Sequence, residues 1–178
     1  MRILLHACCG PCAAVAVERL LESGREVAMF FCNPNLWPQP EWERRLEGVK
    51  KVGEHFHVAV ETEPWDGEAW LRDVGRGRET EREGGARCAA CFEGRLRRTF
   101  QRAQELRFEA FTTSLTTGPR KCSKTLFEIG RRVGGDAFVA EDFKKRNGFL
   151  RSVELARELG LYRQSYCGCE FSILDKNA

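Results

Sequence analysis

Two short apolar runs near the N-terminus, with a helix-forming segment between them, have the pattern of a strand–helix–strand unit. Residues Ile3–Ala7 and Val27–Phe31 are almost continuously apolar, which is typical of strands buried on both faces of a parallel sheet. The segment Ala13–Glu22 is rich in helix formers, and Gly24 follows it as a stop signal. This order predicts a right-handed βαβ crossover and therefore a parallel α/β sheet.

Similar alternation continues along the rest of the chain. We expect a turn at Asn33-Pro34-Asn35 and a mobile loop at Gly75–Ala86, which is rich in Gly, Arg and Glu. The other predicted helices are Glu41–Phe56, Trp65–Val74, Cys88–Arg107, Lys124–Val133 and Ser152–Leu159, and the other predicted strands are His57–Glu61, Phe108–Ser114 and Ala137–Ala140. Together they predict one α/β domain over residues 1–178, with a Rossmann-like parallel sheet flanked by helices, a helical insertion and a Cys-rich C-terminal tail.

The composition is that of a globular protein. Of 178 residues, 42% are hydrophobic and 31% are charged, and this length buries a core without disulfides. No apolar run approaches the ~20 residues that cross a bilayer. The apolar start, Met1–His6, is too short for a secretory signal. We therefore expect a cytoplasmic protein with no membrane partner.

Positive charge is concentrated in the middle of the chain. The net charge is +3, but residues 87–151 carry 15 Lys and Arg against 7 Asp and Glu, whereas residues 1–86 carry 11 against 15. A basic region of this kind suits a polyphosphate partner such as a nucleic acid, and it is equally typical of an ordinary solvated face. Charge alone leaves both interpretations open.

Cysteine is the unusual residue of this composition. The count of nine is odd, no export signal is present, and cytosolic thiols stay reduced, so we expect metal or redox chemistry rather than a disulfide framework. The cysteines are Cys8, Cys9, Cys12, Cys32, Cys88, Cys91, Cys122, Cys167 and Cys169. Cys32 adjoins an apolar strand and is expected to be a packed core thiol, and the role of Cys122 is left open.

Seven of these cysteines form three short clusters. Cys8-Cys9-x-x-Cys12 lies between a predicted strand and helix, Cys88-x-x-Cys91 opens a helix, and Cys167-x-Cys169 has a flexible Gly between its members. Seven sulfurs are too many for one four-coordinate zinc ion. Adjacent side chains of an extended segment point to opposite sides, so we expect Cys8 and Cys9 to serve two neighbouring centres.

The seven clustered cysteines are compatible with several kinds of metal site. Three or four cysteines suit a [4Fe–4S] cluster, and the remaining sulfurs would hold a second iron or zinc or form a thiol redox pair. The alternative is one structural zinc ion held by Cys88, Cys91 and the tail pair.

Polar residues after other strands are further candidates, each with a plain structural alternative. His6 is a proton donor or a buried core histidine, and Asn33 and Asn35 are a pocket rim or simple turn residues. Thr112, Thr113 and Ser114 would bind a phosphate or sugar hydroxyl. Asp142 and Lys144 would serve as an acid and a phosphate contact, or as a cap and a surface charge.

Several short blocks occur in order over nearly the whole chain. They are Leu5–Cys12, Phe31–Asn35, Arg87–Glu93, Thr112–Leu115, Glu141–Lys145 and Leu161–Cys169. Their combination, far more specific than a single Cys-x-x-Cys, resembles the QueH-type epoxyqueuosine reductases. The chain departs from that pattern at Gly10, where alanine is more usual, and some relatives carry a carboxylate at the position of Cys12.

This resemblance implies the last step of queuosine synthesis, in which epoxyqueuosine in a tRNA anticodon loses its epoxide oxygen to give queuosine. It also implies a [4Fe–4S] cluster, an additional adjacent iron or other divalent metal, no cobalamin, and an external electron donor. The implied fold is a Rossmann-like sheet of the HUP type, related to the adenine-nucleotide-binding hydrolases.

The resemblance further implies roles for particular residues. Cys8, Cys9, Cys12, Cys88, Cys91, Cys167 and Cys169 would hold both metal centres, with Cys8, Cys9, Asp142 and His6 as catalytic residues. The tRNA and substrate contacts would be Asn33, Asn35, Arg87, Arg95, Thr112, Thr113, Lys144, Lys145 and Arg163. Which cysteine binds which metal, the proton donor, the reductant, the tRNAs chosen and the oligomeric state are left open.

Two other functions compete with this one. An ATP-dependent tRNA-thiolation enzyme shares the sheet, but it needs a Gly-rich phosphate loop where this chain has Cys8-Cys9-Gly10-Pro11-Cys12. A zinc-stabilised RNA-binding module explains the basic region and two cysteine pairs, but it leaves the first three cysteines without a role.

Overall fold

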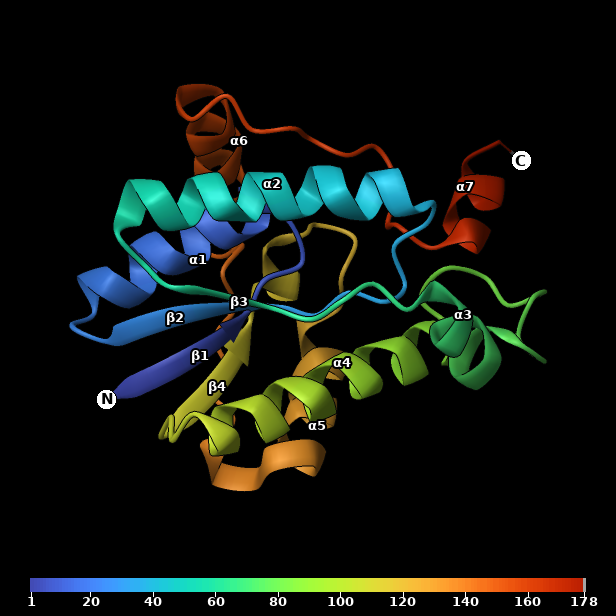
Figure 1. Ribbon diagram of the computed structural model, residues 1–178, viewed down its shortest axis with the longest axis horizontal. Helices are drawn as coiled ribbons and strands as arrows, with labels where there is room; N and C mark the ends of the chain where they lie inside the picture. Colours follow the sequence, from blue (N-terminus) through green and yellow to red (C-terminus); the bar gives the residue numbers. More distant parts are fainter. Residues whose placement is uncertain (178) are drawn as a thin grey trace.

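The computed structural model describes the backbone of residues 1–177 and the side chains of residues 1–173. Its centre is a four-stranded sheet with the order β3-β2-β1-β4, in which every pair of neighbours is parallel (Figure 1). The strands are β1 (Arg2–His6), β2 (Glu26–Phe31), β3 (Val60–Thr62) and β4 (Ala110–Thr113). The predicted parallel α/β sheet is confirmed.

Helices cover both faces of the sheet. Helices α1 (Gly10–Glu22), α2 (Gln39–Phe56) and α6 (Gly148–Glu158) pack on one face, and α4 (Ala86–Glu105) and α5 (Ser123–Gly134) pack on the other (Figure 1). Alternate residues of β1 enter the two cores that result: Ile3 and Leu5 join the first, and Leu4 joins the second. Burial on both faces explains why this strand is apolar at every core position.

The chain departs from the predicted elements in three places. The expected strand Ala137–Ala140 is wrong, because a 3₁₀ turn at Gly135–Ala137 leaves only an isolated bridge between Phe138 and Phe111. The expected helix at 65–74 is shorter, with α3 at Gly67–Trp70 continuing as a π-helical turn over Leu71–Gly75. The tail ends in a further helix, α7 (Glu170–Asn177), which was not predicted.

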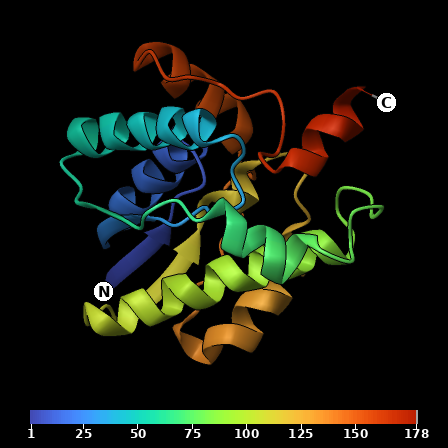
Figure 2. The same ribbon diagram turned by 45° about the vertical axis from the view of Figure 1, so that its right-hand side comes forward.

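The chain after α6 reaches across the molecule. Both views show it running past the N-terminal end of α2 to α7 (Figures 1 and 2). The backbone N–H of Trp37 donates to the carbonyl of Gly168 at 2.7 Å, which attaches this segment to the entrance of α2. The tail therefore lies beside the carboxyl ends of the strands, where parallel sheets collect their ligands.

None of the helices described is both long and apolar enough to cross a membrane.

The start of α6 leaves no space for a side chain at Gly148. A Cβ there would lie 1.7 Å from the carbonyl oxygen of Phe143 and 2.8 Å from Arg19 Nη1, which donates to that same oxygen. We predict that Gly148→Ala lowers the free energy of unfolding by about 1–3 kcal/mol, the usual cost of overpacking. Urea unfolding of the reduced apoprotein, followed by circular dichroism, measures this change.

A matched control is available in α4. Gly94 is exposed in the middle of that helix, and a Cβ there meets nothing within 4 Å. Gly94→Ala should therefore raise the free energy of unfolding by about 0.5–1 kcal/mol, because alanine is the better helix former. Equal effects of the two substitutions would contradict the close approach at Gly148.

Candidate metal centre

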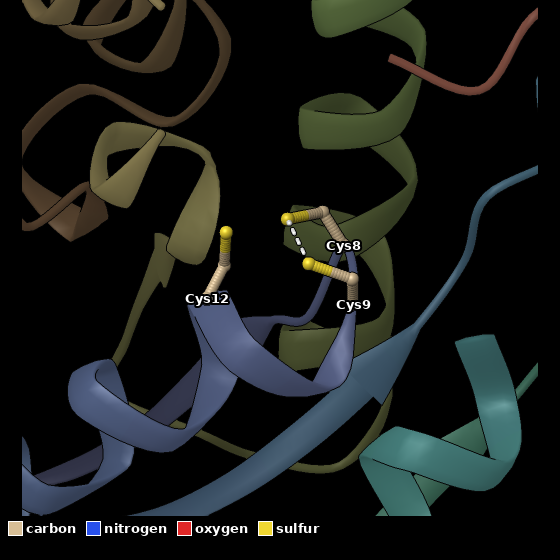
Figure 3. A group of neighbouring side chains, drawn as sticks. All are labelled: Cys8, Cys9 and Cys12. Atoms are coloured by element: carbon tan, nitrogen blue, oxygen red, sulfur yellow. Dashed lines mark hydrogen bonds between the residues drawn. The ribbon is translucent and has the colours of Figure 1, made fainter. Parts of the chain in front are cut away.

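Three cysteines lie together where β1 ends and α1 begins. The ligand atoms of Cys8, Cys9 and Cys12 all lie within 4.8 Å of one another, and the Cys8 and Cys9 sulfurs are 3.8 Å apart. Figure 3 shows the three side chains directed toward the same space. We call these residues the first cysteine group.

The expected orientation of the vicinal pair is wrong. Cys9 has an extended backbone, with φ −170° and ψ 163°, but α1 begins at the next residue, Gly10. Because the chain bends into the helix here, Cys8 and Cys9 bring their sulfurs together rather than to opposite sides. One metal ion is therefore within reach of both sulfurs.

Residues from two distant segments fix the first group. Ser114, after β4, accepts a hydrogen bond from Cys8 N at 3.0 Å and donates one to Cys8 Sγ at 3.3 Å. Gln164, in the tail, donates from Nε2 to Cys9 Sγ at 3.0 Å. These contacts hold the sulfurs in place, and the donors favour the thiolate form that binds metals.

The three thiols also influence one another. Hydrogen bonds from Cys12 and then Cys8 hold the pKa of Cys9 well below its usual value, despite its burial. Hydrogen bonds with Cys8 first, and then with Cys9, raise the pKa of Cys12. Cys9 therefore ionises more readily than Cys12.

The remaining four clustered cysteines form a second group near the start of α4. Cys91 and Cys169 pack with Trp70 and Phe171, and Cys167 Sγ accepts a hydrogen bond from Lys121 Nζ at 2.9 Å. The pKa values of Cys88 and Cys91 are raised, by burial above all and also by the charges of Cys167 and Cys169. We call Cys88, Cys91, Cys167 and Cys169 the second cysteine group.

The two groups differ in the spacing of their sulfurs. A tetrahedral metal ion whose bonds to sulfur are about 2.3 Å long, as for zinc, holds its sulfur ligands roughly 3.8 Å apart. Among the side chains that the structure describes, the first group is the one metal-ligand set that lies within 4.8 Å throughout. The sulfurs of the second group therefore do not all lie within 4.8 Å of one another.

A buried donor next to the second group lacks an acceptor. Arg87 Nε has no hydrogen-bond partner among the described residues, and its guanidinium lies 4.5 Å from the ring centre of Phe171. Burial raises the pKa of the Cys91 thiol, and a hydrogen bond from the indole of Trp70, which packs with Cys91, partly lowers it. An unpaired buried N–H group is costly, and a sulfur atom of a bound cluster would satisfy it. The residues present therefore fit such a group.

A cavity of about 300 Å³ joins the two groups. Cys8 and Cys12 of the first group and Cys167 of the second line it. Its other walls include the basic residues Arg120, Lys121 and Arg163, the aromatic residues Phe149 and Tyr166, the carboxylate of Glu83, and apolar residues such as Leu36 and Leu115. A ligand in this cavity would lie beside both sets of sulfurs and among cations.

A buried ion pair attaches the tail to α2. Arg45 Nε lies 2.7 Å from Glu41 Oε1, and its Nη1 and Nη2 donate to the carbonyls of Cys167 at 2.8 Å and Tyr166 at 3.3 Å. Gly168, with φ +135°, passes so close to Arg45 that a Cβ would lie 3.0 Å from Nη1. Arg45 thus positions the Cys167-x-Cys169 pair.

His6, Asn33 and Asn35 are all buried behind the cavity wall. The two ring nitrogens of His6 contact Thr113 Oγ1 at 3.0 Å and the carbonyl of Cys32 at 3.3 Å. Burial, followed by the charge of Arg95, lowers the pKa of His6 to about 4, so the ring is neutral at pH 7. Asn33 Nδ2 donates to the carbonyl of Ala7 at 2.8 Å.

Thr112, Asp142 and Lys144 also form hydrogen bonds or ion pairs with other groups of the protein. Thr112 Oγ1 donates to the carbonyl of Val139 at 2.7 Å, and both threonines are buried. Asp142 pairs with Lys144 Nζ at 3.1 Å. Burial opposes ionisation of Asp142, but Lys144 and Ser123 outweigh it, so the pKa is lowered.

The predicted basic contacts divide into buried and exposed side chains. Arg87 and Arg95 are buried, and Arg87 Nη1 donates to the carbonyls of Arg78 and Glu79. Lys145 and Arg163 are exposed, and Arg163 lines the cavity.

The two cysteines outside the groups have different environments. Cys32 is buried as expected, and its thiol donates to Glu63 Oε2 at 3.1 Å; burial first, and then Glu63, raise its pKa. Cys122 is exposed at the N-cap of α5.

Sequence reasoning did not identify three residues that contact the cysteine groups or their backbone: Arg45, Gln164, and Lys121 in its role as a hydrogen-bond donor to Cys167. Arg45 occupies one charged position among many in an amphipathic helix, and nothing in its spacing indicates a buried partner. Lys121 and Gln164 contact cysteines 46 and 155 positions away in the chain, and no local pattern shows such contacts.

Comparisons with known proteins agree with one another. The family model described as "Epoxyqueuosine reductase QueH" matches residues 3–175. Curated relatives of that name include those of Streptococcus pyogenes (37% identical, covering 96% of this chain and 69% of the relative), Thermotoga maritima (35%, 98% and 91%) and Staphylococcus epidermidis (32%, 97% and 76%). A solved deacetylase in complex with teicoplanin is only distantly similar, at a TM-score of 0.43 and 12% identity over 74% of this chain and 66% of that one. On the sequence matches, this chain belongs to the epoxyqueuosine reductase QueH family.

Proposed function

We propose that this chain reduces epoxyqueuosine in a tRNA anticodon to queuosine. The epoxide oxygen leaves as water, which consumes two electrons and two protons and leaves a carbon–carbon double bond. The family match names the activity, and the cavity between the two cysteine groups is the observation that supports it in this chain. An external donor supplies the electrons, and the reaction takes place in the cytoplasm, where tRNA is found.

The spacing of the sulfurs supports a division of the metals. We assign a single iron or other divalent ion to the first cysteine group, and a [4Fe–4S] cluster to the second, whose wider sulfurs match a larger group. When bound, the cluster would supply electrons one at a time, and the single ion would act as a Lewis acid toward the epoxide oxygen. No cobalamin is required.

The cavity walls suit a nucleotide removed from its stack. Phe149, which is 41% exposed, and Tyr166 line the cavity, and aromatic rings stack on splayed bases. Arg120 and Arg163 are exposed on the same walls and suit phosphates. The tail closes one side of the cavity and shields the sulfurs from water.

The positions of His6 and Asp142 bear on which residue donates a proton to the substrate. Neither His6 nor Asp142 lines the cavity, and Asp142 is paired with Lys144. Lys121 does line it, and its Nζ donates hydrogen bonds to Cys167 Sγ and to Glu83 Oε1, both at 2.9 Å. Because it lies on the cavity wall, Lys121 is better placed than either to hydrogen-bond the substrate oxygen.

The proposal is tested by metal analysis followed by turnover. Anaerobically purified protein should contain about four acid-labile sulfides and four or five irons per chain, and should convert epoxyqueuosine-tRNA to queuosine-tRNA with a chemical reductant. Zinc alone, persisting after anaerobic reconstitution with iron and sulfide, together with no turnover, would refute the proposal and favour an RNA-binding module.

The first cysteine group is tested by Cys12→Ser. Loss of one of three close sulfurs should remove the single metal ion and reduce turnover at least about 100-fold, while the sulfide content stays near wild type. Iron and sulfide per chain and single-turnover rates are the measurements. Cys122→Ser, which changes an exposed cysteine outside both groups, is the control and should leave all three values unchanged. If Cys12→Ser retained full iron and turnover, the assignment of the first group would be wrong.

The second group is tested by Cys167→Ser. This change should abolish turnover and lower the sulfide content, and tRNA affinity should stay nearly intact because the tail is still attached through backbone carbonyls. Lost tRNA binding with intact metal would contradict the role of Cys167.

The basic wall is tested by the salt dependence of tRNA binding. Arg120→Gln and Arg163→Gln should each weaken tRNA affinity, and each should reduce the slope of log K against log salt by about 1. Arg131→Gln is the control, because this exposed arginine on α5 lies outside the cavity. An unchanged slope in both cavity variants, or the same loss in the control, would show that tRNA does not approach over this wall.

A further inference from the structure

Arg95 of α4 is a buried cation with no carboxylate partner. Its side chain is 4% exposed. Its Nε donates to the carbonyl of Cys91 at 3.4 Å, and its Nη1 donates to Asn33 Oδ1 at 3.1 Å. No carboxylate among the described side chains forms an ion pair with it, in contrast to the buried Arg45, whose Nε lies 2.7 Å from Glu41.

A guanidinium buried in this way needs a negative partner. Removal from water is costly for a charged group, and two neutral oxygens offset only part of that cost. Arg95 borders the same cavity as Cys8 of the first group and Cys167 of the second, and its Nε contacts the backbone of Cys91. Once deprotonated for metal binding, the thiolates of these cysteines would place negative charge around the guanidinium.

A substrate phosphate is the other anion to consider, since Arg95 is part of the cavity wall. At 4% exposure, however, its guanidinium offers almost no surface to an incoming ligand. Arg120 and Arg163 are exposed on the same wall and are far more accessible to a phosphate. The observations therefore favour the sulfurs as the partner of Arg95.

We propose that Arg95 is the shared counter-cation of the two cysteine groups, a positioning residue that stabilises their negative charge and raises the reduction potential of the metals they hold. A fixed positive charge favours the reduced form, which carries the additional electron. The part of this inference that concerns reduction potential rests on the proposed function. This role distinguishes Arg95 from the residues that are expected to contact tRNA.

The charge effect can be measured without the iron centres or turnover. Zn²⁺ added to the reduced apoprotein binds as a thiolate complex, and competition with a chromophoric chelator gives its affinity. Arg95→Gln should weaken Zn²⁺ binding about tenfold or more, as expected for one unit charge a few ångströms away at an effective dielectric constant of about 20. Arg95→Lys keeps the charge and should lose much less.

The matched control lies two residues further along α4. Arg97 has a 59% exposed side chain and pairs with Glu93 at the surface, so Arg97→Gln removes the same formal charge from outside the site. Its Zn²⁺ affinity should equal that of the wild type. In the iron-loaded protein, the midpoint potential should fall in Arg95→Gln and stay unchanged in Arg97→Gln, as measured by redox titration.

Asn33→Asp provides a second variant if Arg95→Gln does not fold. A carboxylate next to Arg95 Nη1 would neutralise the cation without removing it, so Zn²⁺ affinity should again fall. Equal losses in Arg95→Lys and Arg95→Gln, or unchanged Zn²⁺ affinity in both Arg95→Gln and Asn33→Asp, would overturn the proposal. So would intact Zn²⁺ binding with a salt-dependent loss of tRNA affinity, which would identify a phosphate contact. Because the zinc measurement requires no reductase activity, failure of the proposed function would leave its result interpretable.

Discussion

The arrangement of the site depends on the buried ion pair between Arg45 and Glu41. Both residues belong to α2, yet Arg45 also donates hydrogen bonds from its Nη1 and Nη2 to the carbonyls of Cys167 and Tyr166, which are far away in the sequence. Because breaking one member of a buried pair leaves an uncompensated charge, this connection is strongly held. It fixes the tail beside the carboxyl ends of the strands, and Gln164 and Cys167 reach the cavity as a result. Without the pair, Cys167 and Cys169 would not be held beside Cys88 and Cys91, and the second group would be incomplete.

The basic side chains near the sulfurs lie at different depths in the protein and differ in what they contact. Lys121 donates a hydrogen bond directly to Cys167, whereas Arg95 is buried in the cavity wall and Arg120 and Arg163 are exposed on it. Buried cations act on thiolates through a poorly screened interior, and exposed ones act on phosphates through salt solution. The same basic region of sequence therefore divides into a part that concerns sulfur chemistry and a part suited to nucleic acid.

The sequence predicted the features that local pattern controls. The apolar runs of β1 and β2 and the helix stop at Gly24 were sufficient for the parallel sheet, and the Cys-x-x-Cys spacing indicated metal chemistry at strand and helix ends. It did not predict which arginines are buried: Arg95 and Arg97 are two residues apart on one helix, and only packing against the sheet distinguishes them. The bend at Gly10, which turns two adjacent sulfurs to one side, and the contact of Gln164 with Cys9 depend on tertiary structure, for which the one-dimensional pattern holds no signal.

The position of the tail has a consequence for biosynthesis. The ribosome makes the chain from its N-terminus, and folding begins in the same direction. Cys8, Cys9 and Cys12 emerge well before Gln164, Cys167 and Cys169. Until those later residues emerge, the first cysteine group lacks its enclosing segment, so its thiols are open to oxidation. A site built from two segments far apart in the chain is completed only after the later one has been made, and the second cysteine group is incomplete until then.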